Sequence, residues 1–140
     1  MDFKECIDFA NANKTCYLAT VDGDQPRVRA MGMHYADEMG FYFNTENTKS
    51  LAKQLENNQK VEVCFFAQGK MLRVSGKIEF IDDIAIRERF FKERPFLKDA
   101  GVKNPEDPFL MVFALRQGEA FIWTFADNLK EADIPRIKFG

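Results

Sequence analysis

Apolar residues recur along this chain with two different spacings, one typical of helices and one typical of strands. Near the N-terminus they stand at positions i, i+3, i+4 and i+7, and an aspartate precedes them as a capping residue. Pro95 ends the last segment with this spacing. Three helices are therefore predicted, over residues 2–13, over residues 48–57, and from 82 or 83 to 94.

Alternation of apolar and polar residues predicts seven strands. It is clearest in residues 71–81, where every second side chain is apolar or glycine. Turn residues separate the strands at Asp22-Gly23-Asp24, at Gln68-Gly69 and at Gln117-Gly118. The predicted strands are 16–21, 27–35, 39–44, 61–66, 71–81, 109–115 and 119–125, with a loop over 96–108 and a polar tail over 127–140.

Most of these strands follow one another through turns that are too short for parallel crossovers. An antiparallel sheet that closes, wholly or partly, into a barrel is therefore predicted, because closure removes exposed sheet edges. With helices inserted between the hairpins, the fold class is α+β. At 140 residues, one domain covering 1–140 is expected.

Charge and cysteine content narrow the partners. The 20 basic and 22 acidic residues nearly balance, so neither nucleic acid nor a membrane is expected to bind. Residues 1–14 contain charges and no continuous apolar run, so no signal peptide or spanning helix is predicted and a cytoplasmic location is expected. Cys6, Cys16 and Cys64 are widely separated and are expected to be reduced thiols.

The clearest candidate for chemistry is the start of the second helix together with an arginine on a nearby strand. A helix N-terminus offers unpaired N–H groups and a positive dipole end. The Thr45, Thr48 and Ser50 hydroxyls and the Lys49 ammonium would complete an anion cradle there, and Arg29 could add a bidentate contact. The plainer interpretation is that Asn47 or Thr48 only caps the helix and that Lys49 is a solvated charge.

His34 is the only histidine, so any histidine-dependent mechanism must use it. It could ligate haem or act as an acid or base, but a hydrogen-bonded structural role is the commoner one for a strand histidine. One histidine and no paired cysteines do not make a metal site, and no metal is expected. No residue in the sequence can be assigned a catalytic role.

Three segments, in this order and spacing, carry a family resemblance. They read CYLATVDGDQPRVRAMGMHY, GFYFNTENTKSLAKQLENNQKVEVCFF and MLRVSGKIEFIDD. Together they resemble the pyridoxamine 5′-phosphate oxidase-like, FMN-binding split-barrel proteins, particularly small members related to nitroimidazole-resistance flavoproteins. The resemblance implies an antiparallel split β-barrel of about six to seven strands with flanking helices, and a homodimer with FMN at the subunit interface. It also implies that Arg29, Lys49 and Ser50 hold the phosphate and that Ala30, Met31, Asn44 and Thr45 lie along the isoalloxazine and ribityl chain.

The sequence departs from true pyridoxamine phosphate oxidases at several positions. The Ser-Arg-Lys run of that family appears as Thr48-Lys49-Ser50, a family glutamine appears as Met71, and the C-terminal Arg-Leu-x-Pro region has no counterpart. Oxidation of vitamin B6 is therefore not expected.

The resemblance implies a flavin reductase-like oxidoreductase. It would take electrons from a reduced nicotinamide or another small donor and pass them to a small acceptor such as a nitroaromatic or quinone. The alternatives are a non-catalytic flavin- or haem-binding storage or sensor protein, and a structural dimer with no cofactor.

Overall fold

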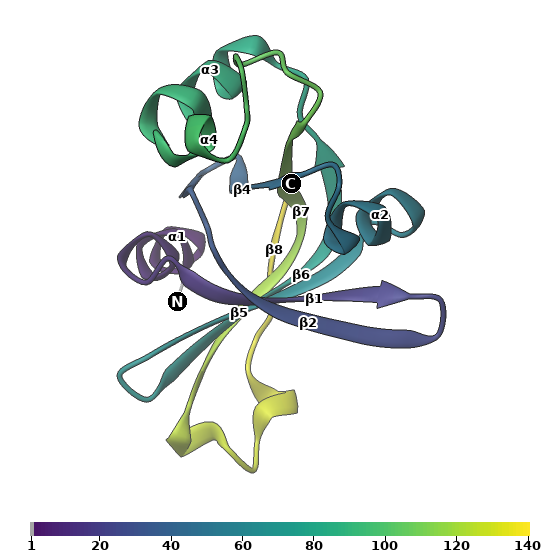
Figure 1. Ribbon diagram of the computed structural model, residues 1–140. Helices are drawn as coiled ribbons and strands as arrows, with labels where there is room; N and C mark the ends of the chain where they lie inside the picture. The colour runs from purple at the N-terminus through teal and green to yellow at the C-terminus, as the bar shows by residue number, and fades with distance from the viewer. Residues whose placement is uncertain (1) are drawn as a thin grey trace.

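The computed structural model describes residues 2–140, whose strands form a single antiparallel sheet. The eight strands are β1 (Thr15–Asp22), β2 (Gln25–Gly32), β3 (Tyr35–Asp37), β4 (Gly40–Glu46), β5 (Lys60–Ala67), β6 (Lys70–Phe80), β7 (Leu110–Thr124) and β8 (Ile137–Phe139). They are hydrogen-bonded in the order β2-β1-β5-β6-β7-β4-β3, and β8 pairs with β7. The sheet curls into a barrel (Figure 1), which stays open because β2 and β3, at the two ends of this order, do not pair. The predicted α+β split barrel is confirmed, with eight strands in place of six or seven.

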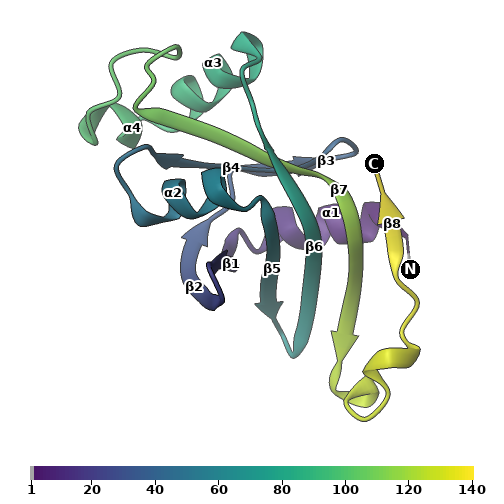
Figure 2. The ribbon, with the colours of Figure 1, turned by 90° about the vertical axis from the view of Figure 1, so that its right-hand side faces the viewer.

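Two helices bury side chains in the barrel interior, and two lie over β4 and β7, as Figure 2 shows. They are α1 (Phe3–Ala12), α2 (Ser50–Asn57), α3 (Ile84–Glu93) and α4 (Phe96–Asp99). The Asp2 carboxylate caps α1 by accepting the Glu5 N–H at 3.0 Å, and Asp83 caps α3 in the same way. The three predicted helices are confirmed to within two residues at either end, whereas α4 lies in the segment predicted to be a loop.

The final hairpin predicted around Gln117-Gly118 is wrong, because β7 runs through both residues as one long strand. Its first half pairs with β4, while pairing with β6 covers most of the strand, with a register shift between Gly76 and Ile78. Gly76 and Gly118 face each other there, and a Cβ on Gly118 would collide with the Ser75 carbonyl oxygen. Gly118 thus permits close approach of two backbones and makes no turn.

The predicted strand over residues 27–35 is in fact two strands. The first strand, β2, pairs with β1 as far as Gly32, and the second, β3, pairs with β4 from Tyr35 onward. Residues 33 and 34 therefore connect the two edge strands of the open sheet. Two backbone hydrogen bonds hold this connection: the Met33 N–H donates to Lys14 O at 2.8 Å and the His34 N–H to Tyr42 O at 2.9 Å. The tail predicted over 127–140 is also corrected, since it ends in β8.

Two buried apolar clusters lie on opposite sides of β4. Phe41 and Phe43 face the barrel interior, where Phe43 stacks on Phe113 with ring centroids 5.4 Å apart. Tyr42 faces the second cluster, which α3 and α4 cover. Because side chains alternate along a strand, Asn44 points to the same side as Tyr42, toward α3.

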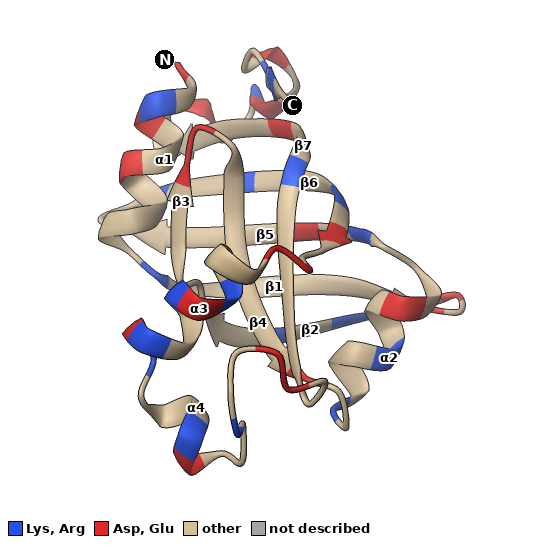
Figure 3. Ribbon diagram, turned by 90° about the horizontal axis from the view of Figure 1, so that it is seen from above, with Lys and Arg blue, Asp and Glu red and all other residues tan. Residues whose placement is uncertain are grey.

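Charged side chains are dispersed over the fold. In Figure 3 the segments bearing Lys and Arg alternate with those bearing Asp and Glu. Among residues 2–140, the helices are all too short and too polar to cross a bilayer.

Candidate functional site

A cleft of about 680 Å³ lies where β2, the end of β4, the start of α2 and the end of α3 meet. Three of its lining residues are cationic and one is acidic. The excess of positive charge suits an anionic ligand. The lining residues are Arg29, Ala30, Met31, Gly32, Asn44, Thr45, Glu46, Lys49, Ser50, Leu51, Arg94 and Phe96.

Arg29 links β2 to α2 through neutral partners. Its Nη2 donates to Gln54 Oε1 at 2.6 Å, and its Nη1 donates to Thr20 Oγ1 at 2.8 Å and to the Leu18 carbonyl at 3.2 Å. Burial, followed by the nearby Arg27, lowers the pKa of the guanidinium from its ordinary value, yet an arginine stays protonated at neutral pH. These contacts leave the positive charge of Arg29 without a carboxylate.

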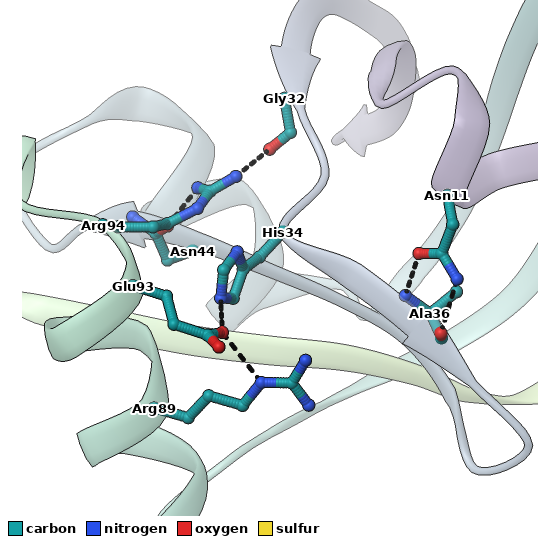
Figure 4. Close-up of polar contacts among 8 residues, drawn as sticks. All are labelled: Asn11, Gly32, His34, Ala36, Asn44, Arg89, Glu93 and Arg94. Carbon is teal, nitrogen blue, oxygen red and sulfur yellow. Dashed lines mark hydrogen bonds and ion pairs between the residues drawn. The ribbon is translucent and has the colours of Figure 1, made fainter.

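Arg94 enters the same cleft from the end of α3 (Figure 4). Its Nη1 donates to Asn44 Oδ1 at 2.7 Å and its Nη2 to the Gly32 carbonyl at 3.2 Å. Burial lowers the pKa of this guanidinium too. The carboxylates of residues 2–140 form ion pairs with neither Arg29 nor Arg94. Two part-buried guanidinium groups bonded only to neutral acceptors are typical of an anion-binding site.

The start of α2 adds a third cation. Lys49 occupies the N-cap position, and no side chain caps the helix there. Its ammonium lies 3.5 Å from the Glu46 carboxylate, in a pair whose lysine is 60% exposed and whose glutamate is 14% exposed. An uncapped helix start next to a lysine can accept further negative charge.

Thr45 supplies a polar atom with no partner. Its side-chain oxygen is buried and makes no hydrogen bond with any group of residues 2–140. Buried hydroxyls in folded proteins are nearly always hydrogen-bonded, so one left open beside a cleft points to a ligand that completes it. Together with three cations and the Ser50 hydroxyl, it forms a donor set suited to a phosphomonoester with a polyhydroxyl chain.

The structure brings seven of the eight residues predicted from the sequence into this cleft: Arg29, Ala30, Met31, Asn44, Thr45, Lys49 and Ser50. Thr48 is exposed in the turn before α2 and does not line the cleft. The part that each of them takes in binding stays a prediction.

Arg94, Glu46 and Phe96 are cleft residues that the sequence reasoning did not identify. In the sequence, Arg94 is the last residue of a predicted helix and precedes a proline. A basic residue at a helix end is common, so its sequence position carries no signal of a binding role.

A second and larger cavity, of about 930 Å³, lies between α1, the β5–β6 turn and the C-terminal segment. Its charges are mixed: lysines at 70 and 130 stand among the carboxylates of Glu5, Asp8, Asp127 and Asp133.

The cysteines do not supply a nucleophile in their ordinary state. Burial raises the pKa of the Cys6 thiol to about 11 and that of the Cys16 thiol to about 12, so neither supplies a thiolate at neutral pH. Within residues 2–140 there is also no cluster of side chains placed to hold a metal ion.

A family profile for pyridoxamine 5′-phosphate oxidase matches residues 3–123. The chain belongs to the pyridoxamine 5′-phosphate oxidase family. A pyridoxine/pyridoxamine 5′-phosphate oxidase from Brucella anthropi is 29% identical over 127 residues, which cover 87% of this chain and 61% of that protein. A pyridoxine-5′-phosphate oxidase from Dictyostelium discoideum is 30% identical over 71 residues, which cover 51% of this chain and 31% of that protein. The matched part of the chain thus spans about three fifths of the length of the Brucella protein and about a third of the length of the Dictyostelium protein.

Several solved structures share the fold of this chain. A NimC/NimA family protein from Clostridium acetobutylicum superimposes with a TM-score of 0.79 at 28% identity, over 97% of this chain and 92% of that one. An FMN-binding protein related to pyridoxamine 5′-phosphate oxidase, from Nostoc punctiforme, gives 0.67 at 13% identity, over 99% and 94%. HutZ, the haem storage protein of Vibrio cholerae, gives 0.65 at 18% identity, over 89% and 95%. The resemblance inferred from the three sequence segments is confirmed.

Proposed function

We propose that this chain binds FMN in the cleft and acts as a flavin reductase-like oxidoreductase that passes electrons to a small acceptor. The observation that carries the proposal is the pair of part-buried guanidiniums, Arg29 and Arg94, that share one cleft without a carboxylate partner. With Lys49 and Glu46 included, the lining residues carry a net charge of two positive units. A phosphomonoester dianion would balance that charge.

Arg29, Lys49 and Ser50 are the residues that would hold the phosphate, beside the open start of α2. The free Thr45 hydroxyl would take a hydrogen bond with the ribityl chain, while Ala30, Met31 and Asn44 would lie along the ring. Bound FMN supplies hydride and single-electron transfer, which no side chain of the cleft provides. The protein's own contribution is to orient the ring and to limit access of water.

Arg94 and Phe96 lie together at the α3 side of the cleft, with the guanidinium carbon 5.3 Å from the ring centroid. Phe96 is 54% exposed and so offers an aromatic face to a ligand. A planar acceptor that carries negative charge would find stacking and a cation at one place. The proposal does not extend to vitamin B6 oxidation, for which the chain lacks the Ser-Arg-Lys run at residues 48–50.

The outward face of the sheet suggests that a second copy completes the site. Phe66, Met71 and Trp123 stand side by side in register on that face, and Phe66 is 52% exposed. Tyr17, which is 47% exposed, pairs with Ala30 of the cleft. We infer a homodimer, because an exposed apolar stripe of this kind is usually buried by a partner. The stripe extends to the cleft through the pairing of Tyr17 with Ala30, so the second copy would also contact the site. Sedimentation of wild type and Phe66→Glu tests this, since a wild-type monomer would contradict it.

Titrations with FMN and with riboflavin test the cofactor. FMN should bind at least about tenfold more tightly, because riboflavin lacks the group that Arg29 and Lys49 would contact. At 100 times its dissociation constant, FMN should also raise the free energy of unfolding by about 2.7 kcal/mol. Equal affinities for the two flavins would refute the phosphate site. Anaerobic reduction of the loaded protein, followed by addition of nitroaromatics and quinones, then tests electron transfer, and a flavin that no acceptor reoxidises would refute the enzymatic role.

Haem bound through His34 has less support. The imidazole is 8% exposed, and its Nε2 is already hydrogen-bonded to Glu93 at 2.8 Å. A Soret band in the purified protein that disappears in His34→Ala would favour haem over FMN.

A further inference from the structure

The C-terminal end of α3 is attached to the rest of the protein at two neighbouring points, one in the cleft and one beside it (Figure 4). At the first, Arg94 reaches Gly32 and Asn44, both of which line the cleft. At the second, Glu93 Oε1 accepts a hydrogen bond from His34 Nε2 at 2.8 Å. Adjacent residues at the end of α3 are thus bonded to neighbouring parts of the chain, Arg94 to two residues that line the cleft and Glu93 to His34 just beyond it.

The two attachments share their backbone support. His34 follows Gly32 by two residues, and its N–H donates to the carbonyl of Tyr42, which precedes Asn44 by two residues. The same stretches of chain therefore carry the partner of Glu93 and both partners of Arg94. A change at the His34–Glu93 contact would move the helix end that holds the Arg94 guanidinium.

The contact also defines the state of the imidazole. An ionised carboxylate only accepts hydrogen bonds, so Nε2 carries the proton and Nδ1 of the neutral ring carries the lone pair. Burial lowers the pKa of His34, and Arg94 and Arg89 lower it further, while Glu93 opposes them.

Every element packed around His34 brings a charged or titratable group. Helix α3 supplies Arg89, Glu93 and Arg94, with Arg89 Nε also bonded to Glu93 Oε1 at 2.8 Å. Strand β3 supplies Tyr35, whose ring lies 5.2 Å from the imidazole and under the Arg89 guanidinium. Strand β4 supplies Tyr42, stacked on Tyr35, whose hydroxyl accepts from Arg116 of β7.

We propose that His34 and Glu93 are positioning residues for Arg94, and that an anion bound at Arg94 and a proton bound at His34 favour each other. This inference rests on the proposed function, in which the cleft takes an anionic ligand. An anion at Arg94 offsets the positive charge that opposes protonation of the imidazole. Because binding linkage is reciprocal, protonation of His34 must strengthen binding of that anion by the same factor.

Sulfate is a suitable probe, because it stays doubly charged across the pH range in which a histidine titrates. Its affinity would be measured at pH 5.5 and 7.5 by isothermal titration, with sodium chloride at matched ionic strength as the reference. The imidazole would be followed by NMR, where the single histidine gives one unambiguous signal. We expect sulfate to raise the pKa of His34 and to bind about threefold more tightly at the lower pH.

Two substitutions of His34 separate positioning from titration. His34→Gln places an amide N–H where Nε2–H stands, so it keeps a donor for Glu93 but cannot titrate. Its sulfate affinity should be the same at both pH values. His34→Leu fills the space without a donor, and its sulfate affinity should be about fivefold weaker than that of His34→Gln at pH 7.5.

A matched pair on α3 controls for charge. Glu93→Gln and Glu88→Gln each remove one negative charge from the same helix, and both glutamates are exposed. Glu93→Gln should lower the pKa of His34, whereas Glu88→Gln should leave the histidine titration unchanged. Equal effects of the two variants would reduce the role of Glu93 to long-range charge and would refute its positioning role.

The outcomes distinguish this inference from the function on which it rests. If sulfate binds and Arg94→Gln weakens the binding, but the histidine titrates identically with and without sulfate, the coupling is wrong and the anion site stands. If Arg94→Gln leaves the sulfate affinity unchanged, the sulfate lies at Arg29 and Lys49, and the role proposed for Arg94 is wrong. If sulfate does not bind at either pH, the anion site is wrong. The interaction between Arg94 and His34 can still be tested in the ligand-free protein. Arg94→Gln should raise the pKa of His34 there, and an unchanged histidine titration would refute the interaction.

Discussion

The cleft at the start of α2 and the cavity beside α1 differ in size and in charge, and the cleft, the smaller of the two, has the stronger claim to a ligand. The larger cavity, beside α1, is lined by four carboxylates and two lysines, and its walls are otherwise mixed. The cleft at the start of α2 has three cations, one carboxylate and a buried hydroxyl without a partner. Volume alone would favour the larger cavity as the binding site. The cations without carboxylate partners and the hydroxyl without a hydrogen bond favour the cleft.

Arginines on the two faces of the sheet teach the same lesson. On the outward face, Arg73 is bonded to the carboxylates of Glu62 and Glu131 at 2.6 and 2.7 Å. In the cleft, Arg29 and Arg94 are bonded to amide, hydroxyl and carbonyl oxygens. A guanidinium that is already paired with carboxylates binds a further anion weakly. The partners of an arginine therefore indicate a binding site better than the arginine alone does.

Replacing a cation in each cavity should give the largest difference. Arg29→Met should weaken FMN binding about 10- to 100-fold, because a charged hydrogen bond contributes about 1.5–3 kcal/mol. Lys70→Met removes the same charge from the larger cavity and should change the affinity less than about twofold. Flavin fluorescence titration measures both, and equal losses would mean that only net charge matters.

The unpaired hydroxyl gives the next largest effect. Thr45→Val keeps the shape and removes a buried oxygen without a partner, so the ligand-free protein should gain up to about 1 kcal/mol in stability. FMN binding should weaken about three- to tenfold. Thr20→Val is the matched control: that hydroxyl accepts from Arg29 and donates to Gln54, and its loss should cost about 1–3 kcal/mol. Chemical denaturation measures the stabilities, and a Thr45→Val protein less stable than wild type would contradict the assignment.

Removing the single acid of the cleft should strengthen phosphate binding slightly. Glu46 competes with a phosphate for Lys49, and such partly exposed pairs contribute about 0–1 kcal/mol. Glu46→Gln should therefore bind FMN about two- to fivefold more tightly. Glu56→Gln, exposed on α2, should leave the affinity unchanged. Weaker binding by Glu46→Gln would show that the carboxylate holds Lys49 in place for the ligand.

The smallest expected effect is a pH dependence of stability. Burial and the neighbouring arginines hold the pKa of His34 below its ordinary value of 6.5 in the folded protein. Between those two pKa values the unfolded chain binds more protons, so the free energy of unfolding should fall as the pH drops from 6.5 through the folded pKa. Denaturation of wild type and His34→Gln at several pH values measures this slope, and the slopes should differ only in that range. Identical slopes would argue against a depressed pKa for His34.

Much of the cleft could be predicted because it is built from short, local pieces of chain. The polar run from Asn44 to Ser50 joins a buried strand to a helix, and its alternation and capping residues are legible in sequence. Arg29 could be added because it stands on the strand that pairs with β1. Alternation and turn residues predicted an antiparallel sheet closed wholly or partly into a barrel, and the family resemblance implied the split barrel.

The remainder depends on contacts that no local pattern records. Arg94 lies 50 residues from Asn44 and 62 from Gly32, so only the packing of α3 against β4 brings them together. The prediction of a turn at Gly118 fails because a glycine looks the same in sequence whether it bends the chain or admits a neighbouring backbone. Short periodicities cannot separate these two uses.

Strand β7 contributes side chains to both apolar clusters, so the two clusters should unfold together. Its residues contribute to the barrel interior and also to the layer beneath α3, so neither can come apart while the other keeps its strand pairing. Melting should then be all-or-none. A ligand bound in the cleft, although it contacts only one part of the molecule, would therefore raise the melting temperature of the whole chain.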